Sequence, residues 1–272
     1  MSSKDIDRYL DFYYRVTGKE RREVDKDLFE TIEEVFDVAT VKAILDLVRR
    51  GMLYELKGVV SAGKEARVYW GVDKEGRDLA VKIYLTTSAE FRKGILKYIR
   101  GDPRFEGKVP SSFRKLIMLW ARKEFRNYKL MYEAGVSVPK PIAQHENILI
   151  MEFIGERGRR APLLKEVVLS EDAYYELFKG ILLDVRKMYL RAGLVHSDLS
   201  EYNVMIWRGR HYIIDVSQSV KKTHPNAMDF LKRDLRNIHR YFRDELGLEV
   251  PSVEVMFKCV TGQEEMFSNP IN

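Results

Sequence analysis

The sequence predicts an α+β fold with two lobes: an antiparallel β-sheet lobe with one helix, preceded by a short N-terminal helical extension and followed by a mostly helical lobe. Short β-rich segments are concentrated in residues 53–154, and helical periodicity dominates after residue 170. A polar, basic stretch, 155–162, separates the two regions and is closed by a proline. We therefore divide the chain into 1–52, 53–154 and 155–272.

The first third of the chain changes from helical to strand-like spacing. Residues 1 to about 50 have helical periodicity that ends before Gly51. Three short segments rich in β-formers follow and are separated by polar turns: Leu53–Val60, Ala66–Val72 and Leu79–Tyr84. The next stretch, 85–111, has several Gly and Pro residues and no clear period, so we expect a long flexible loop with room for a helical part.

The remaining elements have clearer boundaries. A long helix is expected over Phe113–Ala134, because its apolar spacing stops at Gly135. Two strands follow, and after the connector Ser170 is the expected N-cap of a helix that reaches about Ala192. A hairpin should turn at Arg208-Gly209, with further helices from residue 228 onward. The two expected strands are Pro141–His145 and Ile148–Phe153.

Composition limits the class of protein. The 47 Lys and Arg residues exceed the 41 Asp and Glu residues, for a formal net charge of +6, which suits a nucleic-acid-rich partner or a phosphate ligand without requiring either. The longest apolar run, near Ile148, is interrupted at Glu152 and is too short to cross a bilayer, so no membrane association is expected. The first residues, Met1-Ser-Ser-Lys-Asp, contain no apolar stretch that could act as a secretory signal, so none is expected, and the single Cys259 cannot form an internal disulfide. We expect a cytoplasmic protein.

The line His196-Ser-Asp198-Leu-Ser-Glu-Tyr-Asn203, followed by Asp215 after an apolar strand, carries the strongest chemical signal. Phosphoryl transfer needs one carboxylate to orient the attacking hydroxyl. It also needs an amide oxygen and a second carboxylate to hold Mg²⁺ against phosphates. Asp198, Asn203 and Asp215 supply these groups in the chain order of kinase-like folds. The sequence therefore predicts a bilobal protein-kinase-like fold that uses ATP and Mg²⁺, with Mn²⁺ as a possible substitute.

Lys82 lies in the middle of an apolar strand, where an ammonium group is costly unless it has a partner. Kinases place a lysine there to pair with nucleotide phosphates and with a glutamate on the following helix. Glu124 is the best candidate for that partner, and the alternative is an exposed glutamate in an ordinary helical charge pattern.

Two further segments are candidates for nucleotide contacts. The turn containing Ser61 and Lys64 lies between two predicted strands and can present backbone N–H groups to phosphates, although an ordinary hairpin turn would look the same. The segment with Met151, Glu152 and Ile154 ends a strand at the connector. Glu152 and Ile154 could bind adenine through main-chain atoms, with Met151 behind them.

Five motifs together resemble the RIO atypical serine kinases: Ser-Ala-Gly-Lys-Glu-Ala (61–66), Lys-Glu-Phe-Arg-Asn (123–127), Met-Glu-Phe-Ile-Gly (151–155), His-Ser-Asp-Leu-Ser-Glu-Tyr-Asn (196–203) and Ile-Asp-Val-Ser-Gln (214–218). The resemblance covers about residues 40–245 and is closest to the type-one branch, which lacks a winged helix. With little sequence after the core, the chain looks archaeal.

The resemblance implies a role for each matched residue. Asp198 would be the catalytic base, and Asp215 would be a metal ligand that can also accept a phosphoryl group as an aspartyl-phosphate. Lys82 and Glu124 would form the activating ion pair, and the partner of the protein would be the maturing small ribosomal subunit, with its proteins and rRNA. The other implied site residues are Asn203 as a metal ligand and Ser61 and Lys64 at the phosphates.

Two neighbouring residues have structural interpretations. Asp234 is expected to be a buried aspartate that braces the backbone of the catalytic segment, because loop amides need an acceptor. The alternative is a surface carboxylate paired with Arg236. His196 is expected to support the segment and not to act as a base, since a kinase mechanism assigns the proton to the aspartate.

Two other functions remain open. A small-molecule kinase of the aminoglycoside or choline type shares the HxDxxxxN spacing, but only about 57 residues follow Asp215, few for an acceptor pocket. A non-catalytic ribosome- or RNA-binding scaffold would use basic residues of the connector and the C-terminal helices. No DNA partner is expected.

Overall fold

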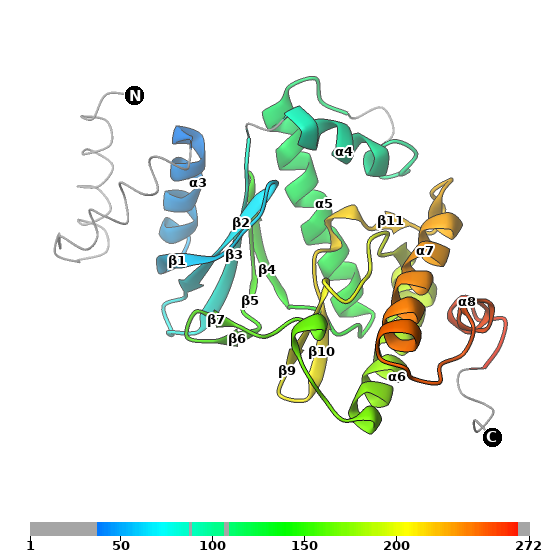
Figure 1. The fold of residues 1–272 in the computed structure, drawn as a ribbon. Helices are drawn as coiled ribbons and strands as arrows, with labels where there is room; N and C mark the ends of the chain where they lie inside the picture. The colour runs from blue at the N-terminus through cyan, green and yellow to red at the C-terminus, as the bar shows by residue number, and fades with distance from the viewer. Residues whose placement is uncertain (1–36, 87–88, 106–108, 266–272) are drawn as a thin grey trace.

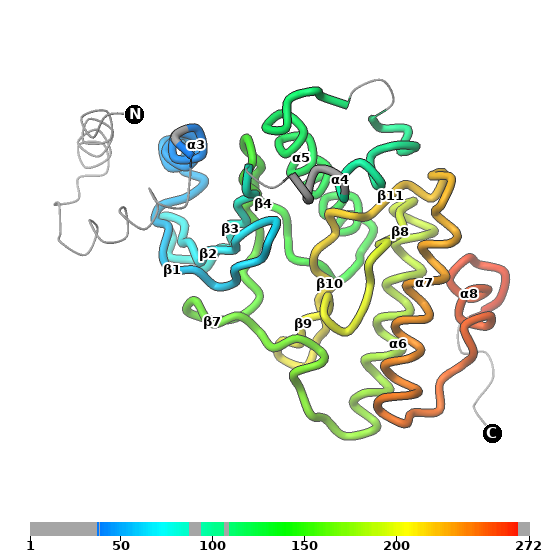
Figure 2. The backbone as a smooth tube through the Cα atoms, turned by 45° about the horizontal axis from the view of Figure 1, so that its top comes forward, coloured from blue at the N-terminus to red at the C-terminus, as the bar shows by residue number. Residues whose placement is uncertain are grey.

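The computed structural model describes residues 37–86, 89–105 and 109–265 (Figure 1). The helices expected before residue 37 lie outside this part of the chain. The described part has a sheet region and a helical region joined by a short connector (Figures 1 and 2).

The sheet region is a five-stranded antiparallel sheet with the strand order β1-β2-β3-β5-β4. All five expected strands are present, and their ends differ from the prediction by two residues or fewer. Their bounds are β1 Glu55–Ala62, β2 Ala66–Val72, β3 Asp78–Tyr84, β4 Pro141–His145 and β5 Ile148–Glu152.

Helix α3 (Val38–Arg49) covers one face of the sheet, and helix α5 (Phe113–Glu133) lies on the other side (Figure 1). Asp37 caps α3 by accepting from Thr40 N at 2.8 Å, as N-cap residues do. The apolar face of α3 packs on alternate residues of β3, including Val81 and Ile83. Because β3 is buried on both faces, α3 is an integral layer of the sheet region, whereas we expected only an appended extension.

Helix α4 (Ala89–Ile99) occupies much of the stretch 85–111, where we expected mainly a loop. Ile95, Tyr98 and Ile99 have helical spacing and are buried. The prediction underweighted this short apolar pattern because Gly94 lies inside the helix, where glycine is usually avoided.

The connector folds into a tight hairpin of β6 (Gly155–Glu156) and β7 (Arg159–Arg160). Asp78 anchors this hairpin to the sheet: its carboxylate accepts from Arg157 N and from Trp70 Nε1, each at 2.8 Å. Gly155 has φ 146°, and a Cβ atom there would lie 2.2 Å from the Arg159 carbonyl oxygen, so only glycine fits.

The helical region is built around α6 and α7, each of which packs against α8 (Figure 2). Ser170 caps α6 as predicted, and the helix continues through a π-helical turn to Gly193, which has a left-handed conformation. The hairpin of β9 and β10 turns at Arg208-Gly209, as predicted. The bounds are α6 Glu171–Lys187, β8 Leu194–Val195, β9 Val204–Trp207, β10 Arg210–Ile213, β11 Val220–Lys221, α7 Ala227–His239 and α8 Val253–Thr261.

One hydrophobic core continues through both regions, from Ala80 and Leu149 in the sheet to Leu231 and Phe242 in the helices. Cys259 is buried in α8. Within the described ranges, every helix is too short or too polar to span a bilayer.

Candidate active site

Lys82 is at the centre of a partly buried ion-pair network. It lies opposite Leu149 in the β3–β5 ladder, and its Nζ atom is 2.8 Å from Glu124 Oε1 on α5 and 3.0 Å from Asp215 Oδ1. The Glu124 side chain is fully buried, so the predicted Lys82–Glu124 pair is confirmed. Burial alone would lower the pKa of Lys82, but the carboxylates of Asp215 and Glu124 hold that pKa well above its ordinary value.

Two tyrosines complete this network, and sequence reasoning assigned neither of them a polar role. The Tyr84 hydroxyl donates to Glu124 Oε2, and the Tyr128 hydroxyl accepts from Asp215 N at 3.0 Å. Tyr84 follows Lys82 by two positions in β3, so the two side chains lie on the same face of the strand. Tyr128 follows Glu124 by four positions in α5, so these two side chains lie on the same face of the helix, opposite that face of the strand. That periodicity is the signal that could have identified them.

Asp234 on α7 holds the backbone of the segment that follows β8. Its carboxylate accepts from Ser197 N at 2.7 Å and from Leu199 N at 2.9 Å, which confirms the bracing interpretation. Asn237, one turn later on α7, donates to Leu199 O at 2.9 Å. These contacts hold Ser197 at φ 71°, in the left-handed region, just before Asp198.

Asp198 and Asn203 are tied together. Asn203 Nδ2 donates to the backbone oxygen of Asp198 at 2.7 Å, which leaves the amide oxygen of Asn203 as the atom that can face a cation. The Asp198 carboxylate accepts from Gln218 Nε2 at 3.1 Å. Burial and the neighbouring charge of Asp215 raise the pKa of Asp198 above its ordinary value.

Asp215 has the opposite electrostatic environment. Although burial raises its pKa, the Lys82 ammonium outweighs this effect and the net shift is downward. Ser217 Oγ also donates to the Asp215 carboxylate, at 3.1 Å. The side chain is about half exposed, with a relative accessibility of 48%. Asp215 is therefore an ionised, accessible carboxylate, as a metal ligand must be.

His196 is buried, and its Nε2 lies 3.1 Å from Ile214 O. Burial lowers its pKa to about 4, so the ring is neutral at physiological pH and bridges the strands that precede Asp198 and Asp215. This geometry agrees with a supporting role.

A cavity of about 510 Å³ lies between the sheet and the helical region. Eight of the ten predicted site residues line it: Ser61, Lys64, Lys82, Met151, Glu152, Ile154, Asn203 and Asp215. Glu124 lies behind Lys82, and Asp198 reaches the wall through Gln218.

A family model described as the RIO domain matches residues 67–255. The chain belongs to the RIO family. It is 39% identical to the serine/threonine-protein kinase RIO1 of Caenorhabditis elegans over 257 residues, which cover 94% of this chain and 50% of that protein. It is 41% identical to the RIO-type serine/threonine-protein kinase Rio1 of Haloferax volcanii over 241 residues, which cover 88% and 80% of the two chains.

The human serine/threonine-protein kinase RIO1 is 38% identical over 256 residues, covering 91% of this chain and 44% of that protein. The chain thus spans about half the length of the worm and human relatives. Among solved structures, the Rio2 kinase ADP/Mg²⁺-phosphoaspartate complex of Chaetomium thermophilum has a TM-score of 0.61 and 26% identity, covering 82% of this chain and 66% of that one. The predicted RIO resemblance and protein-kinase-like fold are confirmed.

Sequence reasoning missed several residues of this RIO site. Glu65 follows Lys64 in the β1–β2 turn and lines the cavity, where partial desolvation together with the charge of Asp215 raises its pKa. A turn has no periodicity that would mark such a side chain. Gln218 lies in the motif 214–218, but nothing in the sequence assigns its side chain a role of its own. The other unpredicted lining residues include Phe153, Arg160, Leu163 and Tyr202.

Proposed function

We propose that this RIO domain is an atypical serine/threonine kinase and ATPase that transfers the γ-phosphate of ATP. One observation carries the proposal: Lys82, Asn203 and Asp215 converge in one cavity, and Asp198 is tied to its wall by Gln218. The cavity volume lies in the usual range for a nucleotide-sized ligand. The names of the kinase relatives support the same chemistry.

The nucleotide would lie along the cavity from the connector to the carboxylates. Glu152 N already donates to Lys140 O, so Glu152 can offer its carbonyl to adenine. Ile154 O accepts from Ala161 N, so Ile154 can offer its N–H group. Met151 would close the rear of the adenine pocket. At the other end, Ser61, Lys64 and Lys82 would contact the phosphates.

The residues present fit Mg²⁺. Within the described part of the chain, no three His, Cys, Asp or Glu side chains are grouped closely enough to form a protein-only metal cage. Asp215 and the amide oxygen of Asn203 instead offer two oxygen ligands. Mg²⁺ is typically held by one or two carboxylates together with substrate phosphates, and it neutralises phosphate charge during transfer. Mn²⁺ would suit the same oxygen ligands.

Asp198 would accept the proton of the attacking hydroxyl as the new bond to the γ-phosphorus forms and ADP leaves. Asp215 could itself be the nucleophile, with its carboxylate oxygen bonding to phosphorus and ADP departing, and water would later cleave the aspartyl-phosphate. The Rio2 kinase structure of Chaetomium thermophilum is a complex with ADP, Mg²⁺ and a phosphoaspartate, which supports this second route. Autophosphorylation on serine is the expected companion activity.

The biological setting we propose is the cytoplasm, in maturation of the small ribosomal subunit. The net charge of +6 suits a partner rich in phosphate groups. The division of the chain into 1–52, 53–154 and 155–272 also remains a prediction.

Asp198→Asn tests the function directly, because it keeps the size of the side chain and removes its basicity. We expect phosphoryl transfer from Mg·ATP to hydroxyl acceptors to fall by about 10²- to 10⁴-fold, while Mg·ADP affinity, measured calorimetrically, stays within about twofold. Asp215→Asn should instead weaken the dependence of nucleotide binding on Mg²⁺. The matched control is Asp229→Asn on the exposed side of α7.

Full turnover by Asp198→Asn would contradict the assigned base. A wild-type protein that binds RNA in a salt-dependent way and does not bind Mg·ATP would favour the scaffold. Turnover with small alcohols and not with ribosomal proteins would favour a small-molecule kinase.

A further inference from the structure

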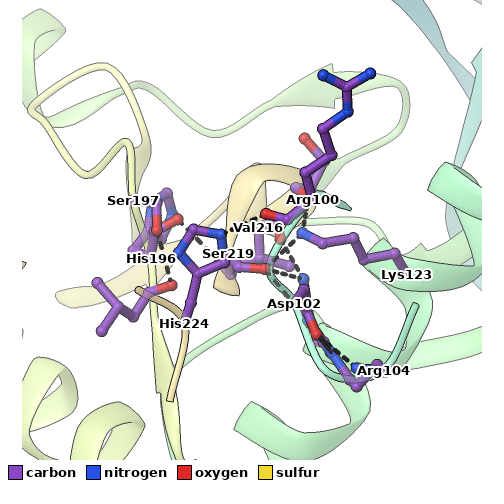
Figure 3. Close-up of polar contacts among 12 residues, drawn as sticks. Arg100, Asp102, Arg104, Lys123, His196, Ser197, Val216, Ser219 and His224 are labelled. Carbon is purple, nitrogen blue, oxygen red and sulfur yellow. Dashed lines mark hydrogen bonds and ion pairs between the residues drawn. The ribbon is translucent and has the colours of Figure 1, made fainter. Parts of the chain in front are cut away.

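The turn after β10 is a 3-10 helix, Val216–Gln218, whose backbone oxygens are held by buried side chains of α5 (Figure 3). Lys123 Nζ donates to Ser217 O at 2.7 Å and to Ser219 O at 2.5 Å. Asn127, one helical turn later, donates through Nδ2 to Val216 O at 2.8 Å and to Ser219 O at 3.2 Å. Neither donor side chain is accessible to solvent.

The segment between α4 and α5 locks these donors in place. Arg104 donates to Asn127 Oδ1 at 2.7 Å, so the amide nitrogen of Asn127 must point at the turn. Arg104 is itself held by the fully buried Asp102 carboxylate, whose oxygens lie 2.6 Å from Arg104 Nη2 and 2.9 Å from Arg104 Nε (Figure 3). His224 fixes the start of this segment by bonding to Arg100 O at 2.9 Å.

The side chains of the same turn reach both functional carboxylates. Ser217 Oγ donates to Asp215 Oδ1, and Gln218 Nε2 donates to Asp198 Oδ2, each at 3.1 Å. Ser219, just after the turn, donates through Oγ to the backbone oxygen of His196 at 3.1 Å. A shift of the turn would therefore move the two carboxylates relative to each other.

Packing alone does not explain a lysine at position 123. Burying an ammonium group is costly, and within the described residues Lys123 forms no ion pair to offset the cost. Burial, assisted by the Arg104 charge, holds the pKa of Lys123 well below its ordinary value. A methionine would fill the same space without that cost. The lysine supplies something that a methionine cannot, namely donors aimed at two carbonyl oxygens of the turn.

We propose that Lys123, Asn127 and Arg104 are positioning residues for phosphoryl transfer, acting through the turn after β10. This inference rests on the proposed function. Helix α5 carries Glu124 for Lys82, Tyr128 for Asp215 N, and the two donors for the turn. The position of one helix thereby sets the lysine and both carboxylates together.

Lys123→Met and Arg104→Met test the proposal, with Arg104→Lys as the conservative variant that retains a donor for Asn127. We expect kcat to fall by about 10- to 100-fold in Lys123→Met, while the KM for ATP changes by less than about threefold. The Mg²⁺ concentration for half-maximal turnover should rise, and backbone amides 215–219 should exchange hydrogen faster. Arg104→Met should show the same changes to a smaller degree, and Arg104→Lys should recover part of them.

Tyr174→Phe is the matched control, since it removes a partly buried hydrogen bond to Val167 O, of 2.7 Å, that does not involve the turn. It should lower the melting temperature without changing kcat or Mg²⁺ dependence. If the Lys123 cluster had only a structural role, Lys123→Met would behave in the same way.

Folded Lys123→Met and Arg104→Met proteins with wild-type kcat, Mg²⁺ dependence and amide exchange would overturn the proposal. If Lys123→Met does not fold, Arg104→Met decides, because Arg104 is partly exposed. If the wild-type protein lacks Mg·ATP turnover, the proposed function fails. The exchange of amides 215–219 then decides whether the cluster holds the turn: faster exchange in the variants supports this role, and unchanged exchange refutes it.

Discussion

At the scale of single residues, the site contains two carboxylates whose surroundings drive their pKa values apart. Burial and the charge of Asp215 raise the pKa of Asp198, whereas Lys82 lowers that of Asp215 against the effect of burial. A group with a raised pKa is better suited to accept a proton, and a group with a lowered pKa remains ionised for a cation. Environment, and not residue type, therefore separates the two roles.

The pH dependence of turnover should reveal this difference. Asp198 must be ionised to accept a proton, and its pKa is raised, so kcat/KM should fall as the pH decreases and should do so at a higher pH than an ordinary aspartate would give. The measurement is a pH–rate profile with saturating Mg²⁺. Asp198→Asn is the control, and its residual rate should not fall as the pH decreases. A wild-type profile without any acid limb down to pH 4 would contradict the assignment.

At the scale of elements, patterns with a fixed period were predictable from sequence and contacts between distant segments were not. The five strands, α5 and the hairpin at Arg208-Gly209 follow from apolar spacing and turn residues. Helix α4 was underestimated because Gly94 interrupts a short apolar pattern.

The same limit applies to the site. The residues in motifs were found, because phosphoryl transfer requires their chemistry at a particular spacing. The polar roles of Tyr84, Tyr128 and Lys123 depend on partners 40 to 96 residues away, and one sequence does not reveal such pairings. That α3 covers the sheet was missed for the same reason.

The β9–β10 hairpin can be strengthened without touching the site. Arg208 and Gly209 have φ values of 50° and 73°, the backbone of a type I′ turn, for which Asn-Gly is the preferred pair. Arg208→Asn should raise the free energy of unfolding by about 1 kcal/mol, as measured by urea denaturation. Arg208→Val is the control and should destabilise the protein, since β-branched residues disfavour positive φ. Equal stabilities of the three proteins would refute this account of the turn.

At the scale of the whole molecule, the sheet and helical regions are not independent units. Apolar residues of both regions contribute to one shared core, beside a second cluster between α3 and the sheet, and the contacts of Lys82, Lys123 and Asn127 cross between the regions. The connector hairpin is tied to the sheet by Asp78. Mutual support of this kind favours cooperative unfolding.

Calorimetry should therefore give a single unfolding transition for both lobes. Mg·ADP at about 100 times its Kd should stabilise the protein by about 2.7 kcal/mol and move that whole transition to higher temperature. Two resolved transitions, or a shift confined to one of them, would contradict a shared core. The control is Mg·ADP with Asp215→Asn, which should give a smaller shift at the same concentration because its affinity is weaker.

The left-handed backbone at Ser197 and Asp215, with φ values of 71° and 57°, restricts which sequences this domain can accept. Glycine, asparagine and aspartate adopt this conformation at low cost, whereas valine, isoleucine and threonine do not. At position 215, the backbone conformation alone would therefore favour only glycine, asparagine and aspartate. Of these three, aspartate is the one with a negative charge. The backbone conformation thus limits the substitutions that position 215 tolerates, independently of any requirement from catalysis.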